Sequence, residues 1–431
     1  MPNTQTVQDQ PTGNYWMPMF IIGVLFFIFG FVTWLNGPLI AFVKVAFDLS
    51  DIQAFLVPMA FYLSYFFLAI PSSWILKAAG MKKGMALGLF VMAVGSLIFG
   101  QFATLRLYPG ALTGLFVIGA GLALLQTAAN PYISILGPID SAAQRIAVMG
   151  ICNKAAGAIA PWVIGALVLG GIGSIDQQVK AAATPQARAA LLDAFADKIH
   201  LPYLVMAAVL VILAVWIVRS SLPELRGSNA NTDPDAAVHT GIFRFPHLWL
   251  GVLCLFLYVG VEVMAGDAIG TYGRGFGLPL DETKFFTSFT LVSMLAGYLV
   301  GLLVIPRFVS QERYLGFSAL LGVLLTLGAF VSHGYVSVGF VAALGFANAM
   351  MWPAIFPLAI RRLGRATEFG SALLIMGIAG GALIPQLFVH LKQYFNFQSV
   401  FLLVMVPCYL YILFYAVYGN RVGLPGHGSE T

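Results

Sequence analysis

The sequence predicts an all-α membrane protein whose twelve spanning helices form two pseudo-symmetric bundles of six. Hydrophobic residues make up 60% of the 431 residues and charged residues only 9%, which is more apolar surface than a water-soluble fold can bury. Apolar runs of about 20 residues, the length that crosses a bilayer, recur along the whole chain. An internal repeat relates the two halves of this series.

The twelve expected spans follow one another with short turns between most of them. Each is identified by an apolar run that continues for about the thickness of the hydrocarbon core. They are placed at residues 17–40, 53–76, 84–104, 110–136, 147–170, 201–219, 247–272, 285–305, 314–332, 335–360, 369–390 and 397–419.

One long polar segment divides the series into six spans plus six. It is rich in Pro, Ser, Asn and Asp, a composition typical of a linker. We therefore expect an N-terminal six-helix bundle over 1–220, a cytoplasmic linker over 221–245 and a C-terminal six-helix bundle over 246–431. Residues 171–200 alternate charges and apolar residues at helical spacing, which predicts a short amphipathic helix on the outer surface, either a lid or an accessory.

The basic residues follow membrane topology. The net charge is +5, but Lys and Arg gather in alternate loops, as at Lys82 and Arg145. Because positive charge marks cytoplasmic loops, both termini are expected in the cytoplasm, and the basicity does not indicate nucleic-acid binding. The cysteines fall inside expected spans and are interpreted as buried apolar residues, without a disulfide or metal role; they are Cys152, Cys254 and Cys408.

The internal repeat is visible in the motifs of the two halves. When the second half is aligned with the first, Asn348 meets Gln126 and Trp352 meets Asn130, both at a shift of 222 residues. Parallel repeats of this kind form two bundles related about the membrane normal, with the substrate held between them at mid-depth.

Polar side chains lie inside the apolar runs of the first half. Such groups are costly in lipid unless they face protein or water, so they are candidate site residues. We expect substrate-binding roles for Asn36, Gln126, Asn130 and Asn153, and a cation-coupling role for Lys154.

Each of these candidates has a structural alternative. The first span is interrupted around Asn36 by a glycine and a proline, which also suits a kinked packing helix. Gln126 and Asn130 share one helical face and could join helices, and Asn130-Pro131 is expected to break that helix. Lys154 could extend its amine to the membrane surface.

The seventh span carries two carboxylates, Glu262 and Asp267. Residues five apart in a regular helix point about 140° away from each other, so Glu262 and Asp267 cannot share one face. Either the helix breaks at Gly266 or the two carboxylates serve different neighbours. A buried carboxylate can bind Na⁺, carry a proton or pair with a buried cation, for which Lys154 is the candidate. Both residues are assigned to cation coupling, with Glu262 as the Na⁺ ligand.

The tenth span contains Asn348 and Trp352. Aromatic faces stack on sugar rings, and amides both donate to and accept from hydroxyl groups, so both residues are assigned to substrate binding. The alternative for Trp352 is a packed core side chain.

These motifs together resemble the fucose permease and glucose/galactose transporter family of the major facilitator superfamily. The resemblance covers the twelve spans and depends most on 124–132 (LLQTAANPY), 136–138 (LGP), 258–262 (YVGVE) and 352–356 (WPAIF). It implies an inner-membrane symporter of a neutral sugar such as fucose, glucose, galactose, mannose or N-acetylglucosamine.

The chain departs from the proton-coupled fucose permease pattern at two positions. That pattern has an acidic residue where this chain has Gly37 and a glutamate where it has Gln126. The resemblance is therefore to the branch with a glutamate in the seventh span, Glu262 here, which includes Na⁺-dependent glucose carriers.

The expected function is import of a neutral hexose or N-acetylglucosamine by cation symport, with Na⁺ preferred over H⁺, through alternating access of a monomer in the bacterial inner membrane. The alternatives are a proton-coupled sugar symporter, a passive sugar uniporter and, less favoured, an exporter of small lipophilic compounds. No cofactor beyond the coupling ion and no nucleic-acid partner is expected. The spacing of reactive side chains indicates no enzyme site.

Overall fold

The computed structural model describes residues 16–136, 142–223, 244–305, 307–363 and 366–424. Within them, twelve helical stretches are long and apolar enough to span a membrane. The all-α fold and the twelve expected spans are thereby confirmed. The expected linker falls mostly outside the described residues, so the division at 220 and 246 stays a prediction.

The described residues of the first half form ten helices. They are α1 (Trp16–Thr33), α2 (Asn36–Ala46), α3 (Asp51–Ala54), α4 (Leu56–Ala79), α5 (Met81–Thr104), α6 (Tyr108–Ile135), α7 (Ala142–Leu167), α8 (Ile172–Ala181), α9 (Pro185–Asp197) and α10 (His200–Arg219).

The second half, as far as it is described, also divides some spans into shorter pieces. They are α11 (Pro246–Gly266), α12 (Ile269–Arg274), α13 (Leu280–Thr283), α14 (Phe286–Val304), α15 (Gln311–Val331), α16 (Gly334–Asn348), α17 (Met351–Ala359), α18 (Thr367–Met376), α19 (Gly380–Leu391) and α20 (Phe397–Val417), with 3₁₀ turns η5 (Gly377–Ala379) and η6 (Gly419–Arg421).

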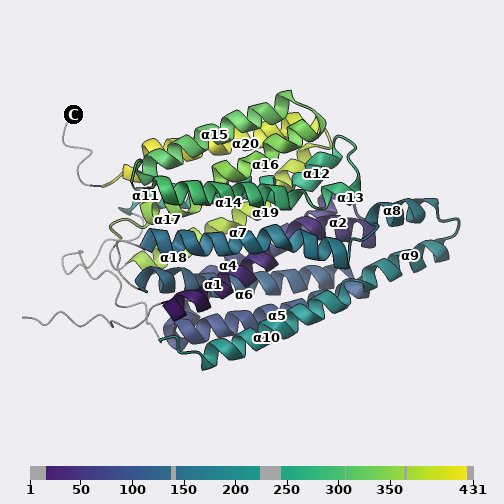
Figure 1. The fold of residues 1–431 in the computed structure, drawn as a ribbon, viewed down its shortest axis with the longest axis horizontal. Helices are drawn as coiled ribbons and strands as arrows, with labels where there is room; N and C mark the ends of the chain where they lie inside the picture. Colours follow the sequence, from purple (N-terminus) through teal and green to yellow (C-terminus); the bar gives the residue numbers. More distant parts are fainter. Residues whose placement is uncertain (1–15, 137–141, 224–243, 306, 364–365, 425–431) are drawn as a thin grey trace, which may run out of the picture.

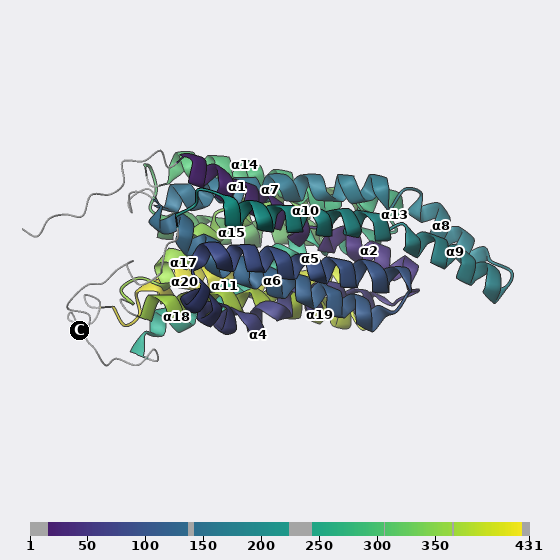
Figure 2. The same cartoon turned by 90° about the horizontal axis from the view of Figure 1, so that it is seen from below.

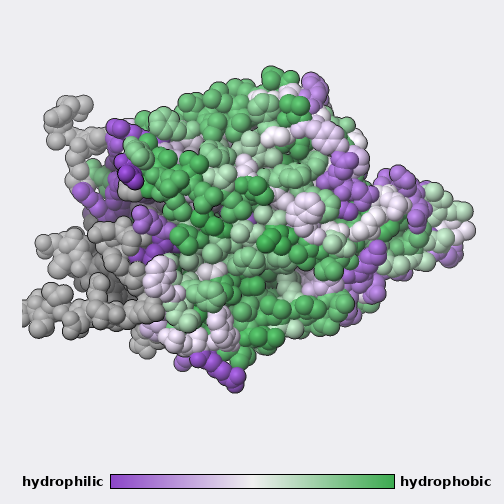
Figure 3. All heavy atoms as spheres, viewed as in Figure 1, coloured by the Kyte–Doolittle hydropathy of each residue, from purple (hydrophilic) through white to green (hydrophobic). Residues whose placement is uncertain are grey.

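The long helices run along one common direction, and the two halves lie side by side (Figures 1 and 2). Helices α8 and α9 project at one end, here named the hairpin end. The start of α1, the end of α10 and the start of α11 lie at the opposite end, here named the terminal end. On the face seen in Figure 3, apolar residues cover the middle and hydrophilic residues gather toward both ends, as expected for a protein whose middle faces lipid.

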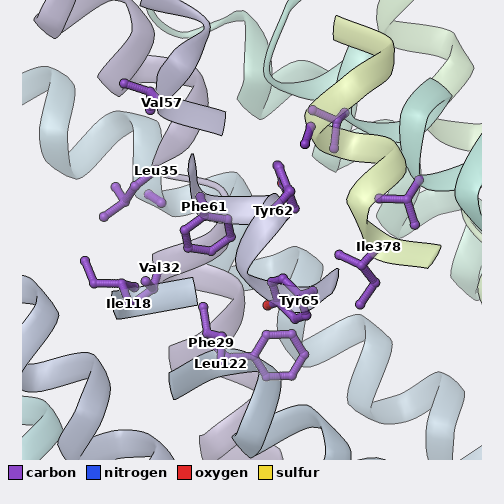
Figure 4. Close-up of a cluster of buried hydrophobic side chains, with 14 of the residues drawn as sticks. Phe29, Val32, Leu35, Val57, Phe61, Tyr62, Tyr65, Ile118, Leu122 and Ile378 are labelled. Carbon is purple, nitrogen blue, oxygen red and sulfur yellow. The ribbon is translucent and has the colours of Figure 1, made fainter. Parts of the chain in front are cut away.

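The halves contact each other along two seams. In one, α4 packs against α18, η5 and α19; in the other, α7 packs against α14. Figure 4 shows Phe61, Tyr62 and Tyr65 of α4 projecting between the helices, with Ile378 of η5 on the side of the second half. Because lipid offers no hydrophobic driving force for helix association, such seams depend on close packing.

Two expectations about helix breaks have different outcomes. The interruption of the first span is confirmed, because α1 ends at Thr33 and α2 begins at Asn36. The expected break at Asn130-Pro131 is wrong, since α6 continues to Ile135. Proline removes only one helical hydrogen bond, a loss that neighbouring helices can accommodate in a membrane protein.

The expected single amphipathic helix over 171–200 is two helices, α8 and α9. Thr184 caps α9, with its hydroxyl accepting from the Ala187 N–H, and Pro185 follows at the favoured first position. The pair forms the projecting hairpin.

Candidate functional site

A central cavity lies between the two halves. Its volume is about 100 Å³, below the range typical of small-molecule sites, so the halves must separate for a hexose to enter. Six residues assigned to the site from sequence line it: Gln126, Asn130, Asn153, Lys154, Glu262 and Trp352. Three others do not: Asn36, Asp267 and Asn348.

An ion pair crosses this cavity from one half to the other. Lys154 Nζ on α7 lies 2.8 Å from Glu262 Oε1 on α11, and the two side chains are 9% and 11% exposed. The Tyr258 hydroxyl donates to the same oxygen at 2.9 Å, and the amine lies 4.5 Å from the Trp34 ring centre. Buried charges need such pairing and added hydrogen bonds. Lys154 therefore points into the protein, and the alternative that it extends to the membrane surface is wrong.

The same contact bears on Na⁺ binding. Glu262 already accepts from Lys154 and Tyr258, so a Na⁺ ion at this carboxylate would have to displace the lysine amine. Among the residues that the structure describes, no group of three or more His, Cys, Asp or Glu is arranged to hold a metal ion.

Trp34 is a site residue that the sequence reasoning missed. It lies between α1 and α2, is 2% exposed, and its Nε1 donates to Asn153 Oδ1 at 3.3 Å. A side chain at Gly157 of the first half or at Gly266 of the second would collide with its indole. Its position at the interruption of the first span was the available signal.

Tyrosines are the other missed residues. Tyr62, Tyr65, Tyr258 and Tyr298 line the cavity. Tyr65 accepts a hydrogen bond from Gln126 Nε2 at 3.0 Å. Only Tyr258 carried a clear sequence signal, because it precedes Glu262 by four residues and so shares its helical face.

Two residues assigned to substrate binding lie away from the cavity. Asn348 is fully buried, and its Oδ1 accepts from the Tyr409 hydroxyl at 2.9 Å. Helix α16 ends at Asn348 and α17 begins at Met351, so the chain turns between Asn348 and Trp352, and only Trp352 faces the cavity. Asn36 is 1% exposed at the start of α2 and does not line the cavity.

Asp267 lies beyond the cavity, toward the hairpin end. Helix α11 ends at Gly266, so Glu262 and Asp267 have different neighbours, and both structural options raised for the seventh span are realised. Asp267 Oδ2 accepts from the Tyr62 hydroxyl at 3.2 Å. A side chain at Gly37 would collide with Thr287 and lie 3.4 Å from Asp267 Oδ1, so Asp267 occupies the space beside Gly37.

Asp267 also lines a second cavity, of about 250 Å³, which is here named the outer cavity. Its charged lining residues are Lys44, Asp51, Asp267, Arg274, Lys284 and Lys392. At its rim, Asp51 of the first half accepts hydrogen bonds from both Lys44 and Lys392, the second of which lies in the other half.

The hairpin end is where the halves are joined. In the described part of the chain, four hydrogen bonds between the halves lie there: Lys392 to Asp51, Gln386 to the Ile52 carbonyl, Lys284 to the Leu169 carbonyl, and the Gly173 N–H to Asp281. The Tyr62–Asp267 and Lys154–Glu262 contacts lie deeper. The structure is therefore closed at this end.

Comparison with known proteins agrees with this architecture. The family model described as Major Facilitator Superfamily matches residues 22–385. The chain belongs to the major facilitator superfamily. The two six-helix halves around a central cavity are the arrangement expected for the superfamily.

Relatives are similar over nearly the whole chain. A glucose/galactose transporter of Brucella abortus is 30% identical, over 95% of each chain. An L-fucose-proton symporter of Escherichia coli is 30% identical, over 86% of each chain. The crystal structure of the superfamily transporter FucP in the outward conformation matches with a TM-score of 0.75 and 27% identity, over 94% of this chain and 99% of that one.

Proposed function

We propose that the protein imports a neutral hexose through the bacterial inner membrane by cation-coupled symport. The observation that carries this proposal is the central cavity, which side chains of both halves line together. It offers amides at Gln126, Asn130 and Asn153, tyrosine hydroxyls and the indole of Trp352. Amides and hydroxyls match sugar hydroxyls, and an aromatic face matches the C–H face of a sugar ring.

The relatives support a sugar as the substrate. Transporters named for glucose, galactose and fucose align along nearly the whole chain. These names support neutral hexoses such as glucose and galactose as the proposed substrate class. Mannose and N-acetylglucosamine are included in the proposal only because the sequence motifs resemble those of the family.

The Lys154–Glu262 ion pair supports a role in coupling. It joins the two halves at the cavity, so its contact changes whenever the halves move. A cation or proton that competes with Lys154 for the carboxylate would bias that movement, and by linkage would change sugar affinity. The expectation of Na⁺ at Glu262 has weaker support than that of a coupling cation in general, because Lys154 already neutralises the carboxylate.

A passive sugar uniporter is the second candidate, and the same ion pair favours it. In the state seen here Lys154 already neutralises Glu262, so no further cation is needed there. Such a carrier would exchange sugar without accumulating it.

Transport in proteoliposomes tests the proposal. Vesicles loaded with unlabelled hexose should take up labelled hexose by counterflow, and a Na⁺ or proton gradient should drive accumulation. Protein-free vesicles are the control. Counterflow without accumulation under any gradient would favour the passive uniporter over the symporter. If no hexose or N-acetylhexosamine showed counterflow, the proposal of a sugar carrier would be contradicted.

A further inference from the structure

Asp267 is a buried carboxylate without an ion-pair partner among the described residues. It is 2% exposed. The Tyr62 hydroxyl donates to its Oδ2 at 3.2 Å, and the backbone of Gly37 lies close enough to favour its ionised form. Its second oxygen, Oδ1, has no hydrogen-bond partner among the described residues. An ionised carboxylate in that state is costly, because these contacts replace only part of the hydration that burial removes.

The charged groups around Asp267 differ on its two sides. Toward the central cavity lie Tyr62 on α4 and the Lys154–Glu262 pair. The outer cavity is lined by Lys44, Asp51, Arg274, Lys284 and Lys392, where Asp51 is shared by two lysines. Burial favours the protonated carboxyl, whereas the surplus of basic groups favours the ionised one. Opposed influences of this kind let a carboxyl exchange its proton during a transport cycle.

The outer cavity is unsuited to Na⁺. Its charged lining carries four basic side chains against two carboxylates, so a metal cation meets net positive charge. A proton does not need several oxygen ligands as a metal cation does. It forms one bond to a carboxylate oxygen and leaves a neutral group.

We propose that Asp267 is the proton-binding site that couples transport to the proton gradient, loaded from water of the outer cavity and gated by Tyr62. This inference rests on the proposed hexose transport and identifies its coupling ion. The proton comes from water on the hairpin side and bonds to an Asp267 carboxylate oxygen. An O–H bond of hydronium breaks as the O–H bond to Asp267 forms. When the terminal end opens, the bond to Asp267 breaks and the proton passes Tyr62 to water of the central cavity, where hydronium forms again.

Closure of the hairpin end supplies the coupling. The Tyr62–Asp267 contact joins the two halves, so it exists only when this end is closed and Asp267 is buried. Closure with an ionised Asp267 must bury a charge, whereas closure with a protonated Asp267 buries a neutral group. Protonation therefore precedes closure, and each turnover carries one proton with the sugar.

Infrared spectroscopy of the purified full-length protein tests the proton site without any sugar. The wild type should show a carboxylic acid C=O band that disappears as the pH is raised. The band should be absent in Asp267→Asn and retained in Asp197→Asn, a control that removes an exposed carboxylate at the same end. In Tyr62→Phe the band should disappear only at higher pH, because the variant loses the hydrogen bond that Tyr62 donates to the ionised Asp267.

Proteoliposome transport tests the coupling. A proton gradient should drive hexose accumulation in the wild type and in Asp197→Asn. Asp267→Asn, which resembles the protonated residue, should lose accumulation while still exchanging labelled for unlabelled hexose.

Three results would overturn the inference: a band that survives in Asp267→Asn, proton-driven accumulation by that variant, or wild-type accumulation driven by Na⁺ alone. If the wild type shows no hexose counterflow, the proposed function fails, whereas the infrared band still decides whether Asp267 binds a proton.

Discussion

The Lys154–Glu262 pair shows how a buried charge depends on its partner. Glu262→Gln should leave the Lys154 amine uncompensated between the halves and lower the free energy of unfolding by about 3–5 kcal/mol. Thermal unfolding in detergent at fixed protein concentration measures this loss.

The double variant Lys154→Met/Glu262→Leu is the control for that prediction. It removes both charges and should recover most of the stability, because well-packed apolar residues often replace a buried pair without loss. Equal destabilisation by the single and double variants would contradict a direct interaction between the two residues.

Gln126 and Asn348, which the internal repeat aligns, should respond differently to the same substitution. Gln126 lines the central cavity, whereas Asn348 bonds Tyr409 away from it. Gln126→Leu should raise the hexose concentration at half-maximal counterflow by roughly tenfold, the effect of losing about 1.4 kcal/mol of hydrogen bonding. Asn348→Leu should lower thermal stability and leave that concentration nearly unchanged. The reverse pattern would show that the cavity is wrongly assigned.

At the scale of elements, interruptions in the helices position the site. The break between α1 and α2 places Trp34 in the slot near Gly157 and Gly266, and the end of α11 at Gly266 separates the surroundings of Glu262 and Asp267. Glycine and proline in the sequence indicated both interruptions. They did not indicate that α6 passes through Pro131 unbroken, because the outcome depends on the helices around it.

The contact between the start of α3 and the end of α19 should act as a latch at the hairpin end. Asp51→Asn removes the charge that Lys392 meets across the halves, so the open state should become more populated. Spin labels at Leu107→Cys and Tyr394→Cys, exposed positions at that end in different halves, would report a larger share of long distances by double electron–electron resonance. An unchanged distance distribution would show that the Asp51–Lys392 contact does not hold the hairpin end closed.

The closed state of the latch should be favoured at alkaline pH. Burial lowers the pKa of Lys392 in the closed state despite the opposing effect of Asp51, so the closed state binds fewer protons than an open state in which this lysine is exposed. By linkage, raising the pH through this range favours closure. The same labelled pair should therefore show a smaller share of long distances as the pH rises, and Asp51→Asn should keep this response because it removes the charge that opposes the effect of burial. A larger share of long distances at alkaline pH would contradict this prediction.

At the scale of the whole molecule, the sequence was sufficient for the fold and for most of the cavity. Long apolar runs predict spans because lipid satisfies no backbone group outside a helix, and polar residues such as Gln126 and Lys154 inside those runs predict the site. The sequence alone did not predict which side chains face the central cavity, because that depends on the direction in which each side chain points. Asn348 turns away at the end of α16, and tyrosines such as Tyr65 contribute polar groups that apolar-run analysis counts as hydrophobic.

Both halves should contribute to one hexose site. Isothermal titration of the purified protein with glucose, galactose, mannose and N-acetylglucosamine tests it most directly. One sugar should bind per chain, with affinity lowered roughly tenfold both by Asn153→Leu in the first half and by Trp352→Leu in the second. Binding that either substitution leaves unchanged, or no binding of any of these sugars, would contradict it.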